Sequence, residues 1–189
     1  MKTLDDVLLE LARLAIYEGL TRKKLIDKQA YINRYPELSK KQAVFVTLNK
    51  IEGDRSSLRG CIGSILPVRP LIDDVIYNAR AAAFNDPRFP PLSLPEFDEI
   101  KIEISLLSIP QKITYTTIDE LKQKVKMFRH GVILKLSGRQ ATFLPQVWEQ
   151  IPDFDLFFEH LCQKAGLAGN CLDYHPEIYV YEVKKIEED

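Results

Sequence analysis

The stretch Ser57–Gly63 constrains the fold most strongly, because it places an arginine, a cysteine and two glycines between strand-forming residues. Residues 43–50 alternate apolar and polar side chains, which is typical of a half-buried β-strand. A polar connection follows, and residues 58–65 form a second strand-like run. This order predicts a β-hairpin whose second strand carries the arginine, the cysteine and the glycines.

Helices are expected on both sides of this hairpin. The first begins at a capping box over Thr3–Asp6, continues with apolar residues at helical spacing and ends near Gly19. Another follows Pro70, because proline suits the first turn of a helix. Two more are expected over Thr117–Val125 and from Asp153 to a glycine C-cap at Gly166.

Three further segments predict strands. Residues 100–106 alternate clearly, and residues 132–136 and 141–144 flank the turn sequence Ser137–Gln140, which indicates a hairpin. A last strand is expected over Ile178–Val183. Because hairpins outnumber βαβ crossovers, we predict an α+β fold, with a mixed, mainly antiparallel sheet and flanking helices. A length of 189 residues fits one domain over 1–189, in two lobes at most.

Composition argues against several classes of protein. The net charge is -1 and most basic clusters have acidic neighbours, so we expect no direct nucleic-acid binding by this chain. No run of 18 apolar residues is present, so no membrane span is expected. The acidic start of the chain does not resemble a signal peptide, and a cytoplasmic location is therefore expected.

The three cysteines form no CxxC pair, which excludes zinc-ribbon and thioredoxin motifs. Cys162 follows an apolar helical pattern and is expected in the core. Cys171 and His175 have the spacing of a metal-ligand pair but lack a second pair nearby. We therefore expect no metal and no cofactor, and reduced thiols throughout.

Regular alternation in the second hairpin strand would place Arg59 and Cys61 on one face, with α-carbons about 7 Å apart. A guanidinium near a thiol favours the reactive thiolate. Gly60 and Gly63 would leave space beside these side chains for a ligand or for another backbone. The alternative is a small buried cysteine, with Arg59 paired to a carboxylate.

Five more residues are candidates for the same site. Glu103 could hold Arg59 or act as a general base, or be a surface carboxylate. Three prolines stiffen the loop that carries Asp86 and Arg88, which could present fixed polar groups or simply form a turn with an ion pair. His130 could transfer protons to and from the cysteine, or be structural. Gln146 could bind a ligand or cap the next turn.

The stretch Leu58-Arg59-Gly60-Cys61-Ile62-Gly63 (LRGCIG) resembles the six-residue signature of the AMMECR family. Four other segments resemble that family in the same order and spacing: Asp86–Pro91, Glu103–Ser108, His130–Val132 and Ala141–Trp148. The resemblance implies an α+β fold of two lobes, a larger one built from both chain ends and a smaller middle one. It also implies that the signature lies near the cleft.

The resemblance further implies partner proteins. Prokaryotic members look like the A component of AmmeMemoRadiSam systems, which also contain a MEMO-like protein and a radical SAM protein. Two functions follow as hypotheses. The first is a cysteine-dependent enzyme or enzyme component. In it Cys61 is the nucleophile or covalent carrier, Arg59 stabilises the thiolate or binds an anionic substrate, and His130 or Glu103 moves protons. The second is a binding or adaptor protein. Nucleic-acid modification is a weaker third hypothesis, since the charge is near neutral.

Overall fold

A computed structural model describes residues 2–189, which divide into two compact units. The first unit contains the residues up to Leu107 together with Lys184–Asp189, and the second contains Ser108–Val183. In chain order the elements are α1 (Leu4–Thr21), α2 (Lys28–Arg34), η1 (Pro36–Ser39), β1 (Val44–Glu52), β2 (Arg55–Gly63), α3 (Leu71–Phe84), α4 (Leu94–Phe97), β3 (Ile100–Leu107), β4 (Gln111–Ile113), α5 (Ile118–Lys124), β5 (Gly131–Leu136), β6 (Arg139–Phe143), α6 (Val147–Gln150), α7 (Phe154–Lys164), η2 (Cys171–Tyr174), β7 (Glu177–Tyr181) and β8 (Val183–Glu187).

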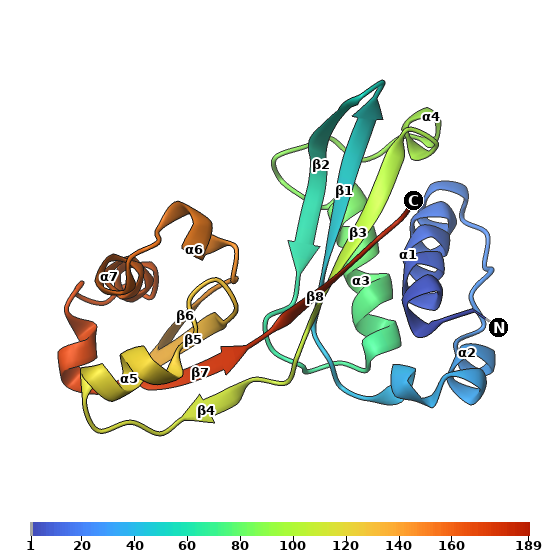
Figure 1. Cartoon of the computed structure of the whole chain (residues 1–189). Coiled ribbons are helices and arrows are strands. Elements are labelled where there is room, and N and C mark those ends of the chain that lie inside the picture. The colour runs from blue at the N-terminus through green and yellow to red at the C-terminus, as the bar shows by residue number, and fades with distance from the viewer. Residues whose placement is uncertain (1) are drawn as a thin grey trace. The chain divides into compact units, whose positions relative to one another are not determined.

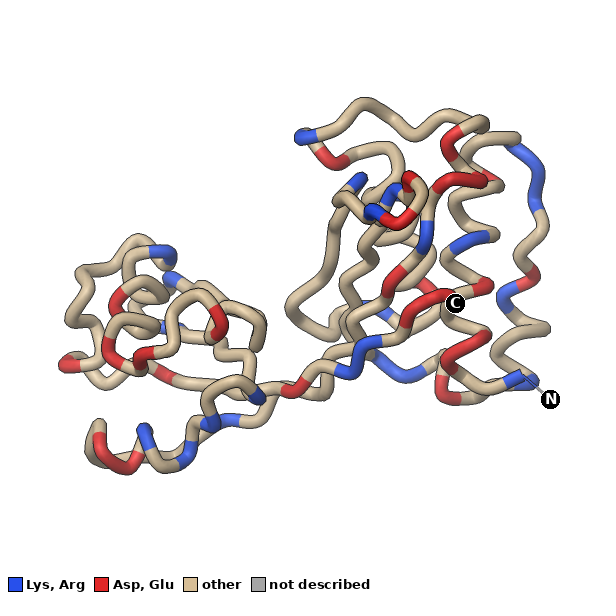
Figure 2. Tube along the Cα trace, turned by 45° about the horizontal axis from the view of Figure 1, so that its top comes forward, with Lys and Arg blue, Asp and Glu red and all other residues tan. Residues whose placement is uncertain are grey.

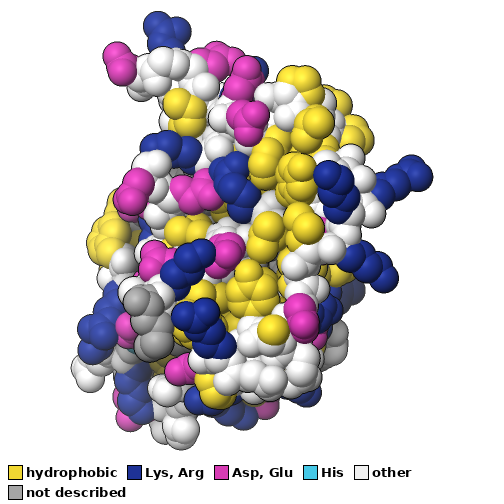
Figure 3. Space-filling view, turned by 90° about the vertical axis from the view of Figure 1, so that its right-hand side faces the viewer, with side chains coloured by type: hydrophobic (Ala, Val, Ile, Leu, Met, Phe, Trp, Pro, Cys, Tyr) yellow, Lys and Arg dark blue, Asp and Glu magenta, His cyan; other side chains and the backbone are white. Residues whose placement is uncertain are grey.

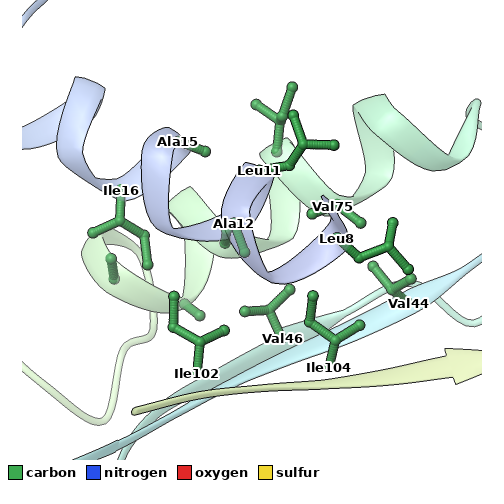
Figure 4. Close-up of a cluster of buried hydrophobic side chains, with 14 of the residues drawn as sticks. Leu8, Leu11, Ala12, Ala15, Ile16, Val44, Val46, Val75, Ile102 and Ile104 are labelled. Carbon is green, nitrogen blue, oxygen red and sulfur yellow. The ribbon is translucent and has the colours of Figure 1, made fainter. Parts of the chain in front are cut away.

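The first unit is a four-stranded sheet, in the order β2-β1-β3-β8, with α1 and α3 packed on one face (Figure 1). Apolar residues of β1 and β3 alternate toward these helices and form the core shown in Figure 4. Leu8, Leu11 and Ile16 of α1 belong to the same core and are fully buried. The opposite side of the sheet, which we call the outer face, carries Phe45, Thr47, Cys61 and Glu103.

The second unit has its own sheet, in the order β4-β7-β5-β6. The β5–β6 hairpin turns at Ser137 and Gly138, both with positive φ, as the turn sequence predicts. Its core is aromatic, and the rings of Trp148 and Phe157 stack with centroids 3.5 Å apart. A disulfide joins Cys162 of α7 to Cys171 of η2.

The α+β prediction is confirmed, and the strand pairings in both sheets are antiparallel. The expectation of reduced thiols is wrong for Cys162 and Cys171, because the chain after α7 turns back and buries Cys171 against that helix. The disulfide also makes the Cys171 sulfur unavailable as a metal-ligating thiolate beside His175. One continuous last strand was expected, but β7 ends at Tyr181 and β8 joins the sheet of the first unit.

Charged residues of both signs are interspersed along the traces of both units (Figure 2). Ion pairs such as Lys28–Asp73 and Arg80–Glu18 link elements within the first unit. On the side of that unit where α1 and α2 lie, hydrophobic side chains form a band between charged ones (Figure 3). Within residues 2–189, no helix combines the length and the apolar character needed to cross a bilayer.

Candidate functional site

A β-bulge interrupts the second hairpin strand within the signature stretch. Leu48 of β1 pairs with Gly60, but the next residue, Asn49, pairs with Leu58, so Arg59 has no partner in the register. A bulge bends a strand and redirects the side chain of the extra residue. The prediction that Arg59 and Cys61 project side by side is therefore wrong, because it assumed regular alternation.

Arg59 is instead buried, with 6% of its surface exposed, and it is held by the chain that follows α3. Its Nε donates to Glu96 at 2.9 Å, and its Nη2 donates to the Pro90 carbonyl at 2.9 Å and to Glu96 at 3.3 Å. Nη1 is buried and has no hydrogen-bond partner among the described residues. Hydrogen bonding by Arg59 lowers the pKa of Glu96 to about 2, with a further contribution from the Ser93 backbone. Glu96, not Glu103, is thus the carboxylate that holds Arg59.

Cys61 lies half-buried on the outer face, directly opposite Thr47 of β1. The Thr47 hydroxyl donates a hydrogen bond to the Cys61 sulfur, with Oγ1 and Sγ 3.2 Å apart. Since Cys162 and Cys171 are joined, Cys61 is the free thiol of the chain.

The proline-stiffened loop covers the edge of β2 at Cys61. The Asp86 carboxylate accepts the backbone N–H of Cys61 at 2.9 Å, and Arg88 donates to the Cys61 carbonyl at 3.3 Å. Arg88 also bonds Asp86 twice, from Nε at 3.0 Å and from Nη2 at 2.7 Å. Two side chains therefore satisfy the edge of the strand in place of another strand, and they fix a cation beside Cys61.

Asp86 and Arg88, which together form a clamp on the backbone of Cys61, also determine the charges around the thiol. Asp86 is 4% exposed, and its hydrogen bonds with Arg88 hold the pKa of the Asp86 carboxyl far below its ordinary value. The same hydrogen bonds raise the pKa of Arg88, and the negative charge of a Cys61 thiolate raises it further. Arg88 therefore takes the position beside the thiol that the sequence assigned to Arg59.

Neighbouring protein atoms fill the space beside the two signature glycines, Gly60 and Gly63. A Cβ on Gly60 would lie 2.2 Å from the carbonyl oxygen of Ala82 in α3, so close backbone packing requires glycine there. A Cβ on Gly63 would meet the ring of Phe45 at 2.1 Å. Of the two occupants expected beside these glycines, a ligand or another chain segment, the structure places a chain segment against each.

Glu103 shares a cross-strand row with the thiol, because Thr47 lies opposite Cys61 on one side and opposite Glu103 on the other. Two strand spacings separate the outer members of the row by about 10 Å. The Glu103 carboxylate is 2.9 Å from the ammonium of Lys185. It is thus a paired carboxylate on the face that carries the thiol.

His130 and Gln146 belong to the second unit. The His130 Nδ1 accepts the backbone N–H of Lys126 at 3.1 Å, and burial lowers the pKa of its ring. Its Nε2 lies 3.9 Å from Glu182. Gln146 is exposed at the N-cap position of α6, without a side-chain capping bond.

Two residues of the site were not among the sequence candidates. Regular pairing of the two hairpin strands from the turn at Gly53 would set residue 47 opposite residue 60, and only the bulge shifts Thr47 opposite Cys61, so the hairpin pattern alone misses this contact by one residue. Glu96 is the third residue of α4 and closes a capping box that begins at Ser93, a position whose carboxylate points back toward the chain before the helix. Neither pattern indicates a ligand by itself.

The first unit therefore brings together a thiol, a hydroxyl that bonds it, and an arginine fixed by a buried carboxylate. This set can perform nucleophilic chemistry without a cofactor, since a cation stabilises the thiolate and a hydroxyl orients it. Among the described residues, no group of three or more His, Cys, Asp or Glu side chains is arranged to hold a metal ion.

Comparison with known proteins gives a consistent result. The sequence model of the AMMECR1 family matches residues 9–186. Protein MK0488 of Methanopyrus kandleri is 39% identical over 97% of this chain and 88% of its own length. A protein of Aquifex aeolicus is 34% identical over 96% of this chain and 91% of its own.

The crystal structure of uncharacterized protein PH0010 from Pyrococcus horikoshii has a similar fold. It superimposes with a TM-score of 0.79 at 36% identity, covering 98% of this chain and 91% of its own.

Proposed function

Because the chain belongs to the AMMECR1 family, we propose that its signature cysteine is the reactive group of a cysteine-dependent enzyme or enzyme component. One observation carries the proposal: Cys61 is half-buried beside a guanidinium that a buried carboxylate holds in place. A structural cysteine needs no such clamp, whereas a nucleophilic one requires stabilisation of its thiolate.

In this proposal Cys61 is the nucleophile or covalent carrier, and Arg88 replaces Arg59 as the cation that stabilises its charge. Thr47 orients the sulfur. Of the remaining candidates in the first unit, Glu103 moves protons, while Gly60, Gly63 and Asp86 shape the binding region. Arg59 holds the loop that carries Asp86 and Arg88, directly at the Pro90 carbonyl and through Glu96. No cofactor is assigned to the site.

The proposed setting is cytoplasmic and includes a MEMO-like protein and a radical SAM protein. Its support is the resemblance of the LRGCIG stretch to AMMECR proteins of AmmeMemoRadiSam systems. Direct binding of nucleic acid is not part of the proposal, since acidic and basic residues balance over the chain.

The experiment is alkylation of Cys61 by iodoacetamide across a range of pH. The proposal predicts that Arg88→Gln slows the reaction near neutral pH by about tenfold, the effect of losing one charge-assisted contact. Thr47→Val should slow it less, and Thr47→Ser should restore it because the hydroxyl is retained. Arg55→Gln is the matched control, since it removes an exposed arginine from the same strand. Equal rates in all variants would remove the nucleophile role.

A second candidate function is a non-catalytic adaptor in a multiprotein complex. The observation in its favour is that packing explains three signature residues: Gly60 against α3, Gly63 under Phe45, and Arg59 with Glu96. Under this reading the signature builds a surface for a partner rather than a reaction.

Co-purification separates the two functions. An adaptor forms a stoichiometric complex with the MEMO-like or radical SAM partner that Cys61→Ser leaves intact. If neither partner co-purifies with the wild-type chain, the adaptor function is contradicted.

A further inference from the structure

The Arg88 guanidinium has donors that the protein itself does not use. Arginine has five N–H groups in a rigid fork. In Arg88, Nε bonds Asp86, and Nη2 bonds Asp86 and the Cys61 carbonyl. Nη1 has no hydrogen-bond partner among the described residues, and the side chain is 54% exposed. Two donors of a fixed cation therefore face solvent next to the thiol.

This arginine is also fixed before any ligand arrives. The Asp86 side chain is 2% exposed and accepts from the Cys61 backbone, so the guanidinium is anchored to the strand that carries the sulfur. A pre-organised fork loses less entropy on binding than a mobile lysine would.

Negative charge nearby would weaken an anion site. The nearest carboxylate of the cross-strand row, Glu103, is paired with Lys185, and Asp86 is already matched by Arg88 itself. Across from the thiol lies the neutral Thr47 hydroxyl, which accepts or donates without repelling an anion.

We propose that Arg88 is the anchor for a carboxylate on the substrate, so that the thiol acts on small electrophiles bearing a carboxylate. This inference rests on the proposed role of Cys61 as a nucleophile. It assigns a substrate class: the carboxylate oxygen accepts from Arg88 Nη1, which places the electrophilic carbon of the same molecule within reach of the sulfur.

Iodoacetate and iodoacetamide test this directly, because they differ only in a carboxylate in place of an amide. In both reactions the thiolate sulfur forms a bond to the CH₂ carbon, and iodide leaves with the electron pair. Both reagents consume the same thiolate, so the ratio of their rate constants does not depend on how much thiolate is present.

The readout is that ratio, iodoacetate over iodoacetamide, divided by the same ratio for a free cysteine peptide. We expect about fivefold preference for iodoacetate in the wild-type chain, declining at high salt as exposed charges are screened. Arg88→Gln should return the ratio to the peptide value, Arg88→Lys should keep part of it, and Arg55→Gln should leave it unchanged. Circular dichroism of each variant checks the fold, and the wild-type salt series needs no variant.

The two failures are distinguishable. Slow reaction with both reagents contradicts the proposed nucleophile but leaves the ratio measurable. Fast reaction without a preference for iodoacetate, or a preference that survives Arg88→Gln, overturns the carboxylate anchor alone.

Discussion

The two units bury different kinds of side chain. Among the described residues, the buried charged and amide side chains lie in the first unit: Arg59, Asp74, Asn78 and Asp86. The buried polar groups described in the second unit are neutral, and one of them, the Thr142 hydroxyl, donates to the carbonyl of Val132. The second core is built instead from stacked aromatic rings and a disulfide.

This difference separates a unit that depends on directional polar contacts from one that depends on apolar burial and a cross-link. A buried ion pair adds little net stability, but removing one of its partners is costly. Apolar burial and a cross-link stabilise without such directional demands. The second unit is thus built for stability, whereas the first accepts costly polar groups that hold the loop and strand around Cys61.

The largest expected effect tests the buried pair of the first unit. Glu96→Ala leaves the Arg59 guanidinium buried without a carboxylate, so the free energy of unfolding should fall by about 3–5 kcal/mol. Urea denaturation followed by circular dichroism measures this. Glu99→Ala is the matched control, because that carboxylate is 53% exposed and should cost under about 0.5 kcal/mol.

A double variant sharpens the result. Arg59→Met with Glu96→Leu should recover much of the lost stability, since an apolar pair of similar volume replaces the ion pair. Equal destabilisation by Glu96→Ala and Glu99→Ala would contradict the contrast between the units.

The next effect concerns the disulfide of the second unit. Cys171→Ser opens a loop that spans a sequence separation of 9 and should lower stability by about 2–3 kcal/mol. Trp148 is the single tryptophan of the chain and lies in that core, so its fluorescence reports the unit directly. Unfolding seen by circular dichroism at lower urea, with the Trp148 fluorescence transition unaltered, would contradict this prediction.

Acid should act on the first unit. The pKa of Glu96 is lowered from 4.5 to about 2, chiefly by hydrogen bonding from Arg59. A lowered carboxyl pKa stabilises the fold above pH 4.5, and this stability is lost as pH falls toward about 2. Allowing for partial exposure, the loss is about 2 kcal/mol. In the Arg59→Met, Glu96→Leu variant the acid loss should be smaller by this amount, with the remainder due to other lowered carboxyls such as Asp86, and an unchanged loss would contradict the assignment to Glu96.

Alkali should act on the second unit, with the smallest effect. Burial raises the pKa of Tyr181 from 10.0 to about 12. A raised tyrosine pKa stabilises the fold below pH 10, and that stability is lost as pH rises through about 12. The expected loss is about 1–2 kcal/mol. In Tyr181→Phe, the loss of stability at high pH should be smaller when Trp148 fluorescence is followed. An unchanged loss would contradict its assignment to Tyr181.

Much of the fold could be predicted from local patterns. Alternation located the hairpin and the strand at residues 100–106, and the capping box at Thr3 marked the start of α1. The β8 strand escaped prediction because Lys184 and Lys185 interrupt any apolar pattern there. The disulfide escaped because it depends on how the chain after α7 folds back, which spacing does not encode.

The site was predicted only in part. Cys61, Asp86 and Arg88 were candidates and do lie together, since the stiff loop and the strand edge are both local features. The partner of Cys61 was misassigned to Arg59 because a bulge leaves the sequence looking like a regular strand. Because Arg59 is the unpaired residue of the bulge, its side chain is buried, and Arg88 is the arginine that lies beside the thiol.

If Cys61 is the reactive group proposed above, folding of the first unit makes its thiol more reactive. Since the other cysteines are joined, the unreduced wild-type chain presents a single thiol both folded and in urea. The most direct measurement compares its iodoacetamide rate constant in the two states, each corrected with a cysteine peptide in the same solvent. We predict a faster reaction in the folded protein. A slower reaction there would contradict the account and leave Cys61 as a packed residue of the sheet.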